Sequence, residues 1–308
     1  MTQPPQWAPE IEFGPEDARA LIAAQFPPLA GASLRPFANG WDNTAYLIDE
    51  RFVFRFPRRT IAAPLIEREI ALLPLLAPRL PAAISAPIFA GVPSAGYPWH
   101  FAGYARIGGA TLADVRVRGA ALATQLGAFL RALHAIDPQP LFDAGLPFDE
   151  IGRLDYARRA PMAQQRLSYL HDRGLLADPA PLVAALAGIA PRPDEAAPRV
   201  LHGDLYALHV LAEPDGTLCG IIDWGDIHAG DPALDLAISD LVFDDEDNAA
   251  FDAAYGPIDK RTRARARWRA IYHAALTADY AHRTGNAALL AVSLDALRRL
   301  AGSRGDRG

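Results

Sequence analysis

Cysteine and lysine are almost missing from this chain, although it is 308 residues long. The single cysteine, Cys219, excludes an intramolecular disulfide bond. The single lysine is Lys260, against 29 arginines, so the first 259 residues offer no lysine for base chemistry or phosphate binding. A site in that part of the chain that needs a permanent positive charge must therefore use arginine.

Long hydrophobic runs and an excess of positive charge are missing too. No apolar run approaches the roughly 18 residues that a membrane helix needs. Residues 1–13 lack the basic and apolar segments of a signal peptide. The net charge of −6 and the pI of about 5.7 disfavour a nucleic-acid-binding protein, whose surface is usually basic. We expect a cytoplasmic protein without a membrane or nucleic-acid partner, and the sequence indicates no oligomeric state.

The first third of the chain mixes helical and strand patterns. Residues 15–25 predict a helix that begins at a proline and continues with acidic residues. Residues 45–48 and 52–56 are rich in β-formers and predict a hairpin, which follows a loop at 38–44. Residues 64–76 carry apolar side chains at helical spacing. This part of the sequence therefore predicts a small β-rich lobe with one important helix.

The pattern changes after residue 106, where Gly108 and Gly109 interrupt it. Two further strands are expected before this break, at 88–90 and 99–106. Beyond it, the expected helices are 119–135, 154–175 and 179–189, two short strands lie at 210–212 and 218–222, and helices continue to about residue 300. We expect an α+β fold with an N-terminal lobe at 1–106 and a larger, mainly helical lobe at 107–308.

Two polar clusters beside apolar runs carry the chemistry. The first is His202-Gly203-Asp204-Leu205, and the second is Ile222-Asp223-Trp224-Gly225-Asp226. One carboxylate can orient a hydroxyl nucleophile, and a second can hold magnesium on the phosphates of a nucleotide. Phosphoryl transfer needs such parts because its barrier is lowered mainly by alignment and by neutralising charge.

The order of these segments resembles the aminoglycoside and macrolide phosphotransferase family, whose members are relatives of the protein kinases. The resemblance extends from about Leu34 to about Val242 and includes two more segments, Phe129–His134 and Gly230–Ala237. It implies a bilobal, protein-kinase-like fold with a nucleotide-binding N-terminal lobe. It also implies an enzyme that moves the γ-phosphate of ATP or GTP to a hydroxyl group of a small molecule with the help of Mg²⁺.

The resemblance assigns roles in the larger lobe. Asp204 would be the catalytic base, Asp223 would bind Mg²⁺, and His202 would orient the loop as a structural residue. His209 stands where most relatives carry asparagine, although some macrolide phosphotransferases resemble this chain in having histidine there. Because Mg²⁺ prefers oxygen ligands, His209 would bind it weakly or through water, would favour Mn²⁺, or would make no metal contact.

The nucleotide side depends on an arginine. Arg55 lies in the second hairpin strand, where kinases place a lysine, and its charge suits phosphate oxygens. Arg58 and Arg59 are competing choices for this cation. The acid that holds it should lie on the next helix, where Glu69 matches the family better than Glu67.

Two further segments complete the expected nucleotide site. Backbone amides near Gly40, together with Asn43 or Thr44, would approach the phosphates. Backbone groups between Tyr104 and Ile107, which join the lobes, would pair with the purine ring. The sequence does not distinguish ATP from GTP.

Other polar residues have structural and functional interpretations side by side. Asp235 is expected to brace the catalytic loop, and Asp231 either does the same or caps a helix at Pro232. The acidic run 240–247 would attract an aminated substrate or form a solvated loop. The basic stretch 260–267 is expected to be a solvated helix face.

Several functions therefore stay open at the level of sequence. The first is a kinase for an aminoglycoside- or macrolide-type antibiotic, and a metabolic kinase for choline, homoserine or a sugar shares its motifs. A metal-dependent hydrolase would use His202, Asp204, Asp223 and His228 as ligands. A nucleotide-binding protein with little transferase activity is conceivable because His209 replaces asparagine and the lysine is missing.

Overall fold

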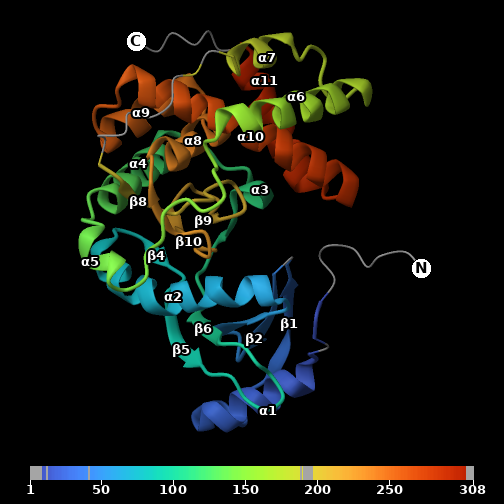
Figure 1. Cartoon of the computed structure of the whole chain (residues 1–308), viewed down its shortest axis with the longest axis vertical. Coiled ribbons are helices and arrows are strands. Elements are labelled where there is room, and N and C mark those ends of the chain that lie inside the picture. The colour runs from blue at the N-terminus through green and yellow to red at the C-terminus, as the bar shows by residue number, and fades with distance from the viewer. Residues whose placement is uncertain (1–8, 12, 41, 188, 190–196, 303–308) are drawn as a thin grey trace. The chain divides into compact units, whose positions relative to one another are not determined.

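The computed structural model describes residues 9–11, 13–40, 42–187, 189 and 197–302, and this part of the chain forms two compact units (Figure 1). Unit 1 comprises Met1–Pro78, Ile84–Ile107 and Asp223–Asp226. Unit 2 comprises Arg79–Ala83, Gly108–Ile222 and Ile227–Gly308. Among the described helices, none is both long and apolar enough to span a membrane.

An antiparallel sheet of five strands forms the centre of unit 1. The strands stand in the order β1 (Leu34–Asn39), β2 (Asn43–Ile48), β3 (Phe52–Pro57), β6 (Phe101–Ala105) and β5 (Pro87–Gly91). The hairpin expected at 45–56 is confirmed, because β2 and β3 pair from Ile48 opposite Phe52 to Asn43 opposite Pro57.

One expected loop is wrong in its extent. Residues 38–44 were expected to be a loop because asparagine, aspartate and glycine dominate them. In the structure Asn39 pairs with Thr44, so the ends of this segment belong to β1 and β2. Turn-forming residues mark a tight hairpin as readily as a loop, and composition alone does not separate the two.

Two helices cover opposite faces of this sheet (Figure 1). Because side chains alternate along a strand, Phe54 and Phe56 share one face, where they pack with Ile22 of α1 (Pro15–Gln25). On the other face, Tyr104 packs with Ile66 of α2 (Ala63–Leu76). Both expected helices are confirmed, and the face under α2 is the one that carries polar chemistry.

Unit 2 is mainly helical. Its helices are α3 (Leu112–Val115), α4 (Ala120–His134), α5 (Gln139–Phe142), α6 (Tyr156–Asp172), α7 (Ala180–Ala185), α8 (Ala233–Val242), α9 (Asp245–Tyr255), α10 (Lys260–Thr284) and α11 (Ala287–Gly302). Its short strands are β7 (Ala110–Thr111), β8 (Arg199–Leu201), β9 (Val210–Ala212), β10 (Leu218–Ile221) and β11 (His228–Gly230). The helices expected at 119–135 and 154–175 are confirmed as α4 and α6, whereas the helix expected at 179–189 is shorter, because α7 ends at Ala185.

The remaining elements are short. Strand β4 (Ala83–Ile84) lies where the sequence passes from one unit to the other. The 3₁₀ turns are Pro27–Leu29, Thr60–Ala62 and Ala77–Arg79.

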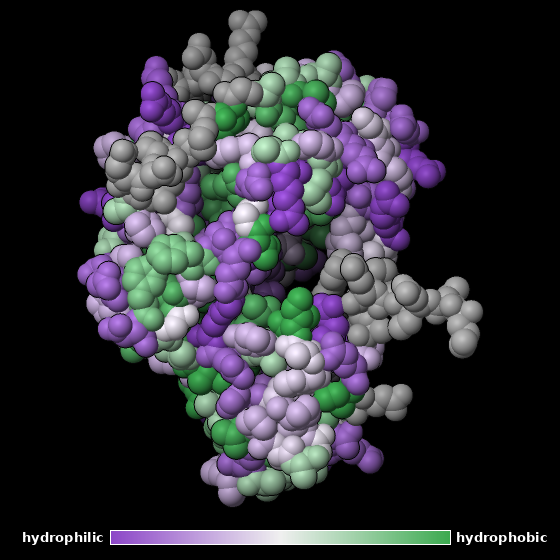
Figure 2. Space-filling model, in the orientation of Figure 1, coloured by the Kyte–Doolittle hydropathy of each residue, from purple (hydrophilic) through white to green (hydrophobic). Residues whose placement is uncertain are grey.

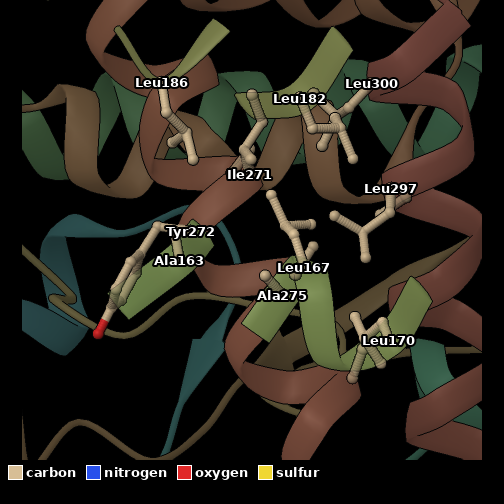
Figure 3. Packing of buried hydrophobic residues seen from close by; sticks show 14 of the residues in the cluster. Ala163, Leu167, Leu170, Leu182, Leu186, Ile271, Tyr272, Ala275, Leu297 and Leu300 are labelled. Carbon is tan, nitrogen blue, oxygen red and sulfur yellow. The ribbon is translucent and has the colours of Figure 1, made fainter. Parts of the chain in front are cut away.

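A helical core of unit 2 surrounds α10. Leu167 and Leu170 of α6, Leu182 of α7 and Leu297 of α11 pack with Ile271 of α10 (Figure 3). Burying these apolar side chains fixes α10 along its length, so polar residues one turn apart on it are held in place. The surface in Figure 2, in contrast, intersperses hydrophilic and hydrophobic residues, as expected for amphipathic helices.

Candidate active site

A cluster of four polar side chains lies under α2 in unit 1; we call it the Arg55 cluster. Arg55 Nη1 donates to Glu69 at 2.9 Å from Oε1 and 3.2 Å from Oε2. Its Nη2 donates to Asp223 Oδ1 at 2.8 Å. The Tyr104 hydroxyl donates to Glu69 Oε2. A residue from the second sequence motif thus joins the arginine and the acid expected on the nucleotide side.

The sequence explains why this pair forms. Arg55 lies between Phe54 and Phe56, whose side chains enter the aromatic core, so strand alternation turns Arg55 to the α2 face. Glu69 lies on the buried side of α2 and is fully buried. The alternative acid, Glu67, is half exposed and contacts His100 Nδ1 at 2.9 Å. Glu69 is therefore the acid that meets Arg55.

Burial and charge act together on the cluster. Burial disfavours a charged guanidinium, but Glu69 and Asp223 outweigh it and raise the pKa of Arg55 well above its usual value. Burial also raises the pKa of Glu69, and Arg55 opposes that effect. The pKa of Tyr104 is raised by burial and by Glu69, so its hydroxyl keeps the proton that it donates. The Arg55 guanidinium is therefore permanently charged and held in one orientation.

Asp223 is held in an uncommon backbone conformation. Its φ of 63° is left-handed, which few residues other than glycine, asparagine and aspartate adopt. The side chain is 46% exposed even though it pairs with Arg55. The following residues lie against α2, since a Cβ on Gly225 would be 3.2 Å from Leu65 Cβ. A partly exposed carboxylate is a suitable oxygen ligand for Mg²⁺.

The competing arginines contact the turn between β1 and β2. Arg58 Nη1 donates to the Gly40 carbonyl at 3.1 Å, and Arg59 forms an ion pair with Asp42. The Gly40 amide donates to the Asn43 carbonyl at 2.9 Å and closes the turn. Trp41, which belongs to the expected phosphate loop, lies outside the described residues.

The other expected phosphate and purine contacts remain predictions. Thr44 is part of β2, and Asn43 Oδ1 is a buried acceptor without a hydrogen-bond partner in the described part of the chain. Tyr104 lies within β6, where its backbone is opposite Val53, and Ile107 follows the end of that strand. The sequence did not foresee the contact of Tyr104 with Glu69, although strand alternation places it two residues from Ala102 on the α2 face.

In unit 2, Asp235 holds the loop that contains the first motif. Its Oδ2 accepts from the His202 amide at 2.7 Å, and its Oδ1 accepts from the Gly203 amide at 2.9 Å. His134 Nε2 lies 3.3 Å from Oδ2. Burial alone would raise the pKa of Asp235, but His134, His202 and the Gly203 amide hold it below its usual value. The expected bracing role of Asp235 is confirmed.

Asp231 has the structural role. Its Oδ1 accepts from the Ala233 amide at 3.0 Å at the start of α8, and its Oδ2 accepts from Arg265 Nε at 2.6 Å. Arg265 is buried, so the expectation of a solvated face at 260–267 is wrong at this position. Asp231 needs a buried partner, and one helix turn of the basic stretch supplies it.

His202 is fully engaged by backbone groups. Its Nε2 donates to the Ile222 carbonyl at 3.0 Å, and its Nδ1 accepts from the Asp204 amide at 3.2 Å. Burial lowers the pKa of His202, so the ring is neutral. Because neither nitrogen is left for a metal, the ligand set of a hydrolase that would include His202 is not supported.

The Asp204 carboxylate has neighbours on α10 that the sequence did not suggest. Its Oδ1 lies 3.6 Å from Arg269 Nη2 and 3.9 Å from His273 Nδ1. The side chain is 30% exposed, so it is accessible to a substrate. The spacing of Arg269 and His273, one helix turn apart, was the available signal, but nothing in the sequence connected that turn with Asp204.

His209 lies beside the same carboxylate. Its Nδ1 is 2.7 Å from the Asp204 carbonyl, which fixes the proton on Nδ1 and the lone pair on Nε2. The Tyr206 ring packs against it with centroids 4.3 Å apart. An imidazole nitrogen suits Mn²⁺ better than Mg²⁺. Among the described residues, no group of three metal-ligating side chains is assembled.

The acidic run is part of a helix start. Asp244 accepts from the amides of Glu246 at 3.1 Å and Asp247 at 3.0 Å, which caps α9. Asp247 accepts from the Gly119 amide at 3.0 Å. These contacts give Asp244 and Asp247 structural roles, and residues 245–247 belong to a helix and not to the solvated loop that was the alternative.

The structure thus groups the expected residues within each unit. The set in unit 1 is Arg55, Glu69, Tyr104 and Asp223, with Gly40, Asn43 and Thr44 at the neighbouring hairpin and Ile107 after β6; the set in unit 2 is Asp204 and His209. Convergence of Asp204 and Asp223 on one metal ion stays a prediction.

Comparisons with known proteins give one family. The model described as "Phosphotransferase enzyme family" matches residues 33–271. The chain is also 32% identical over 63 residues to the uncharacterized protein YcbJ of Bacillus subtilis (strain 168). That match covers 19% of this chain and 21% of YcbJ, so it spans only about a fifth of the relative.

Solved structures resemble the whole fold. The GDP complex of wild-type aminoglycoside 2'-phosphotransferase-IIIa has a TM-score of 0.68 at 24% identity, covering 94% of this chain and 99% of that one. Macrolide 2'-phosphotransferase type I has a TM-score of 0.58 at 24% identity, covering 96% and 100%. The macrolide 2'-phosphotransferase MphH from Brachybacterium faecium has a TM-score of 0.56 at 24% identity, covering 86% and 92%. These likenesses confirm the expected α+β, kinase-like fold class.

Proposed function

Because this chain belongs to the phosphotransferase enzyme family, we propose that it transfers the γ-phosphate of ATP or GTP to a hydroxyl group of a small molecule. The observation that carries the proposal is the Arg55 cluster. A buried acid and a partly exposed aspartate hold one guanidinium, and the two aspartates of the sequence motifs then have separate tasks. Domains 1–106 and 107–308 would carry the nucleotide and the catalytic chemistry, respectively.

On the nucleotide side, Arg55 supplies positive charge to the phosphate oxygens. Glu69 keeps the guanidinium from rotating away, and the Tyr104 hydroxyl fixes Glu69 in turn. Asp223 would hold Mg²⁺, with His209 as a weaker ligand that favours Mn²⁺. The metal, when bound, neutralises charge on the phosphates. Gly40, Asn43 and Thr44 would approach the phosphates, and the segment from Tyr104 to Ile107 would meet the purine.

On the acceptor side, Asp204 would accept or orient the proton of the substrate hydroxyl. Asp235 holds the backbone just before Asp204 through two amide contacts, and His202 fixes the loop from within. Such positioning matters because a small displacement of a catalytic group is costly to the rate. Since the reaction consumes ATP or GTP, we expect it to take place in the cytoplasm.

Two observations support two different kinds of acceptor. The solved neighbours named for aminoglycosides and macrolides support an antibiotic-type hydroxyl compound. The arginine beside Asp204 supports a metabolic acceptor instead, since a cationic antibiotic would meet a positive charge there. A kinase for a compound of the homoserine, sugar or choline type is therefore the second candidate, and choline suits the arginine least.

A screen of hydroxylated compounds with ATP and with GTP tests the proposal. The panel contains aminoglycosides, macrolides, sugars, amino alcohols and hydroxy acids, and nucleoside diphosphate release with transfer of labelled phosphate is the measurement. We expect transfer to at least one class, dependent on Mg²⁺ or Mn²⁺. Tight nucleotide binding without transfer to any hydroxyl would favour a nucleotide-binding protein instead.

A further inference from the structure

Arg269 is a buried arginine whose charge has no carboxylate at hydrogen-bond distance. Only 6% of the residue is exposed. Its nearest carboxylate oxygen is Asp204 Oδ1 at 3.6 Å, which is an ion-pair distance and not a hydrogen bond. In the described part of the chain its side chain makes one hydrogen bond, from Nη2 to His273 Nδ1 at 3.2 Å. Buried guanidinium donors are normally satisfied more fully.

Other buried arginines of unit 2 are satisfied in that way. Arg265, one turn earlier on α10, donates to Asp231 at 2.6 Å. Arg153 donates to Asp149 at 2.7 Å. Unlike these two arginines, Arg269 has no carboxylate at hydrogen-bond distance, and it lies beside Asp204.

His273 adds a second unsatisfied donor. Because its Nδ1 accepts from Arg269, the neutral ring carries its proton on Nε2. That nitrogen is buried and has no hydrogen-bond partner among the described residues. Burial holds the pKa of His273 well below its usual value, with Arg269 contributing, so the ring stays a neutral donor. The His273 Nε2 donor and the neighbouring Arg269 guanidinium are together suited to an anion.

Two further guanidinium groups lie near Arg269. Arg153 and Arg159 lie close enough to Arg269 to lower its pKa together with burial. Arg159 also donates to the Tyr272 hydroxyl at 3.0 Å, and the ring of Tyr272 lies 5.5 Å from the Arg269 guanidinium carbon. Arg153 is neutralised by its pair with Asp149, and Arg159 adds positive charge near Arg269.

We propose that Arg269 and His273 bind an anionic group of the acceptor, so that the substrate is a hydroxy acid whose hydroxyl lies against Asp204. The inference rests on the proposed function, because it takes Asp204 as the group that orients the hydroxyl. A hydroxyl within hydrogen-bond reach of Asp204 brings the neighbouring substrate atoms to the Arg269 guanidinium. A carboxylate there gains charge-assisted hydrogen bonds, whereas an ammonium group is repelled.

Matched acceptors separate this inference from the proposed function. Hydroxy acids of three to six carbons are compared with diols and amino alcohols of the same length, and with kanamycin. Phosphate transfer is followed with ATP and GTP, and binding is measured by calorimetry without nucleotide. We expect kcat/KM to be at least about tenfold higher for the best acid than for its diol, and lowest for the amino alcohol.

Variants then assign the preference to α10. Arg269→Gln should raise the acceptor KM about ten- to a hundredfold for acids only, leave the nucleotide KM unchanged, and be partly rescued by Arg269→Lys. His273→Gln should weaken acid binding less. Arg283→Gln, an exposed position at the other end of α10, should change neither constant.

Each outcome has a clear meaning. Preferred transfer to amino alcohols or kanamycin would overturn the inference and leave the proposed function standing. An equal loss of kcat for every acceptor in Arg269→Gln would also overturn it, since Arg269 would then only position Asp204. Failure of every acid to bind the wild-type protein would overturn it without any variant, whereas acid binding without transfer in any class would count against the proposed function alone.

Discussion

Single residues in this protein carry charge in surroundings that would not tolerate it without a partner. Glu69 is fully buried, and its carboxylate accepts hydrogen bonds from Arg55 and from Tyr104. Asp235 is buried with two backbone amides as donors. Both buried carboxylates therefore have the hydrogen-bond partners that they need, and these partners fix their orientation.

Asp204 is the residue whose loss should affect the rate most. We expect Asp204→Asn to lower kcat by about two to four orders of magnitude, the range of a positioned acid–base group, while the nucleotide Kd stays similar. Steady-state kinetics and nucleotide titration measure both quantities. Asp215→Asn, in an exposed turn, is the matched control. A folded Asp204→Asn protein with normal turnover would remove this residue from the mechanism.

Arg55 should matter for stability as well as for nucleotide binding. Arg55→Ala leaves Glu69 buried without its cation, so we expect the free energy of unfolding to fall by about 3 kcal/mol. The comparison is Arg35→Ala, which breaks an exposed ion pair with Glu50 and should leave the urea midpoint nearly unchanged. Equal midpoints for the two variants would show that the Arg55 pair contributes little.

Arg55, Glu69 and Asp204 could be predicted from the sequence, whereas the neighbours of Asp204 on α10 could not. Arg55 and Glu69 lie on successive elements, and strand and helix periodicity turn both to one face. Arg269 and His273 are 65 or more residues from Asp204 along the chain, and only the packing of α10 brings them near it. No local pattern encodes that distance.

At the scale of elements, close packing between helices decides which residue a position can accept. Helices α4 and α9 approach each other at Gly127, where an added Cβ would lie 2.5 Å from the Phe251 carbonyl oxygen. A backbone atom cannot turn aside as a flexible side chain does. The glycine is therefore required by the contact, although glycine is a poor helix former.

Gly127→Ala should therefore destabilise the protein in spite of better helix propensity. We expect the free energy of unfolding to fall by about 1–3 kcal/mol, because α4 and α9 must move apart. In the control Gly302→Ala, the new methyl group meets nothing within 4 Å, and propensity alone should act, with no loss of stability. Urea denaturation followed by circular dichroism compares them, and a stabilised Gly127→Ala protein would contradict the packing argument.

Regular helices and strands were predictable because their apolar residues recur at helical or strand spacing in the sequence. Helix α1 begins at Pro15 and ends at Gln25, as its pattern indicates. The prediction of a loop at 38–44 was wrong in its extent because a hairpin turn and a loop share their composition. Only the pairing of Asn39 with Thr44, a contact between strands, distinguishes them. The turn of α10 next to Asp204 is likewise brought there by tertiary packing, which local sequence does not reveal.

The whole molecule combines a family fold with an unusual set of buried histidines. The order of the motifs was sufficient to predict the phosphotransferase family and the kinase-like fold, and both are confirmed. The acceptor was not predictable, because the sequence motifs concern phosphoryl transfer and not the substrate. The proposed preference for an acidic acceptor depends on Arg269, which lies outside the motifs.

Stability should fall in mild acid because two buried histidines are neutral when folded. Burial lowers the pKa of His202 and of His273, so below about pH 6.5 the unfolded chain binds protons that the folded chain does not. The full contribution is present above that pH and is lost as the pH falls towards the folded values, by up to about 1.4 kcal/mol per pH unit for each group.

Urea midpoints between pH 7.5 and 5.5 test this expectation. The wild-type protein should lose stability across the range, and His273→Gln should lose less of it than the wild type does. Since other titrating groups are common to both proteins, the difference between the two slopes belongs to His273. Identical slopes would mean that His273 titrates with the same pKa in the folded and the unfolded protein.

The stretch from Asp223 to Asp226 belongs to unit 1 although more than a hundred residues separate it from the rest of that unit. A fragment made of the first 107 residues would keep all five strands and both helices but would leave Arg55 facing Glu69 without its second carboxylate. Unit 1 is therefore no portable module. A recombination event that exchanged residues 1–107 alone would separate Arg55 from Asp223, a partner encoded far downstream.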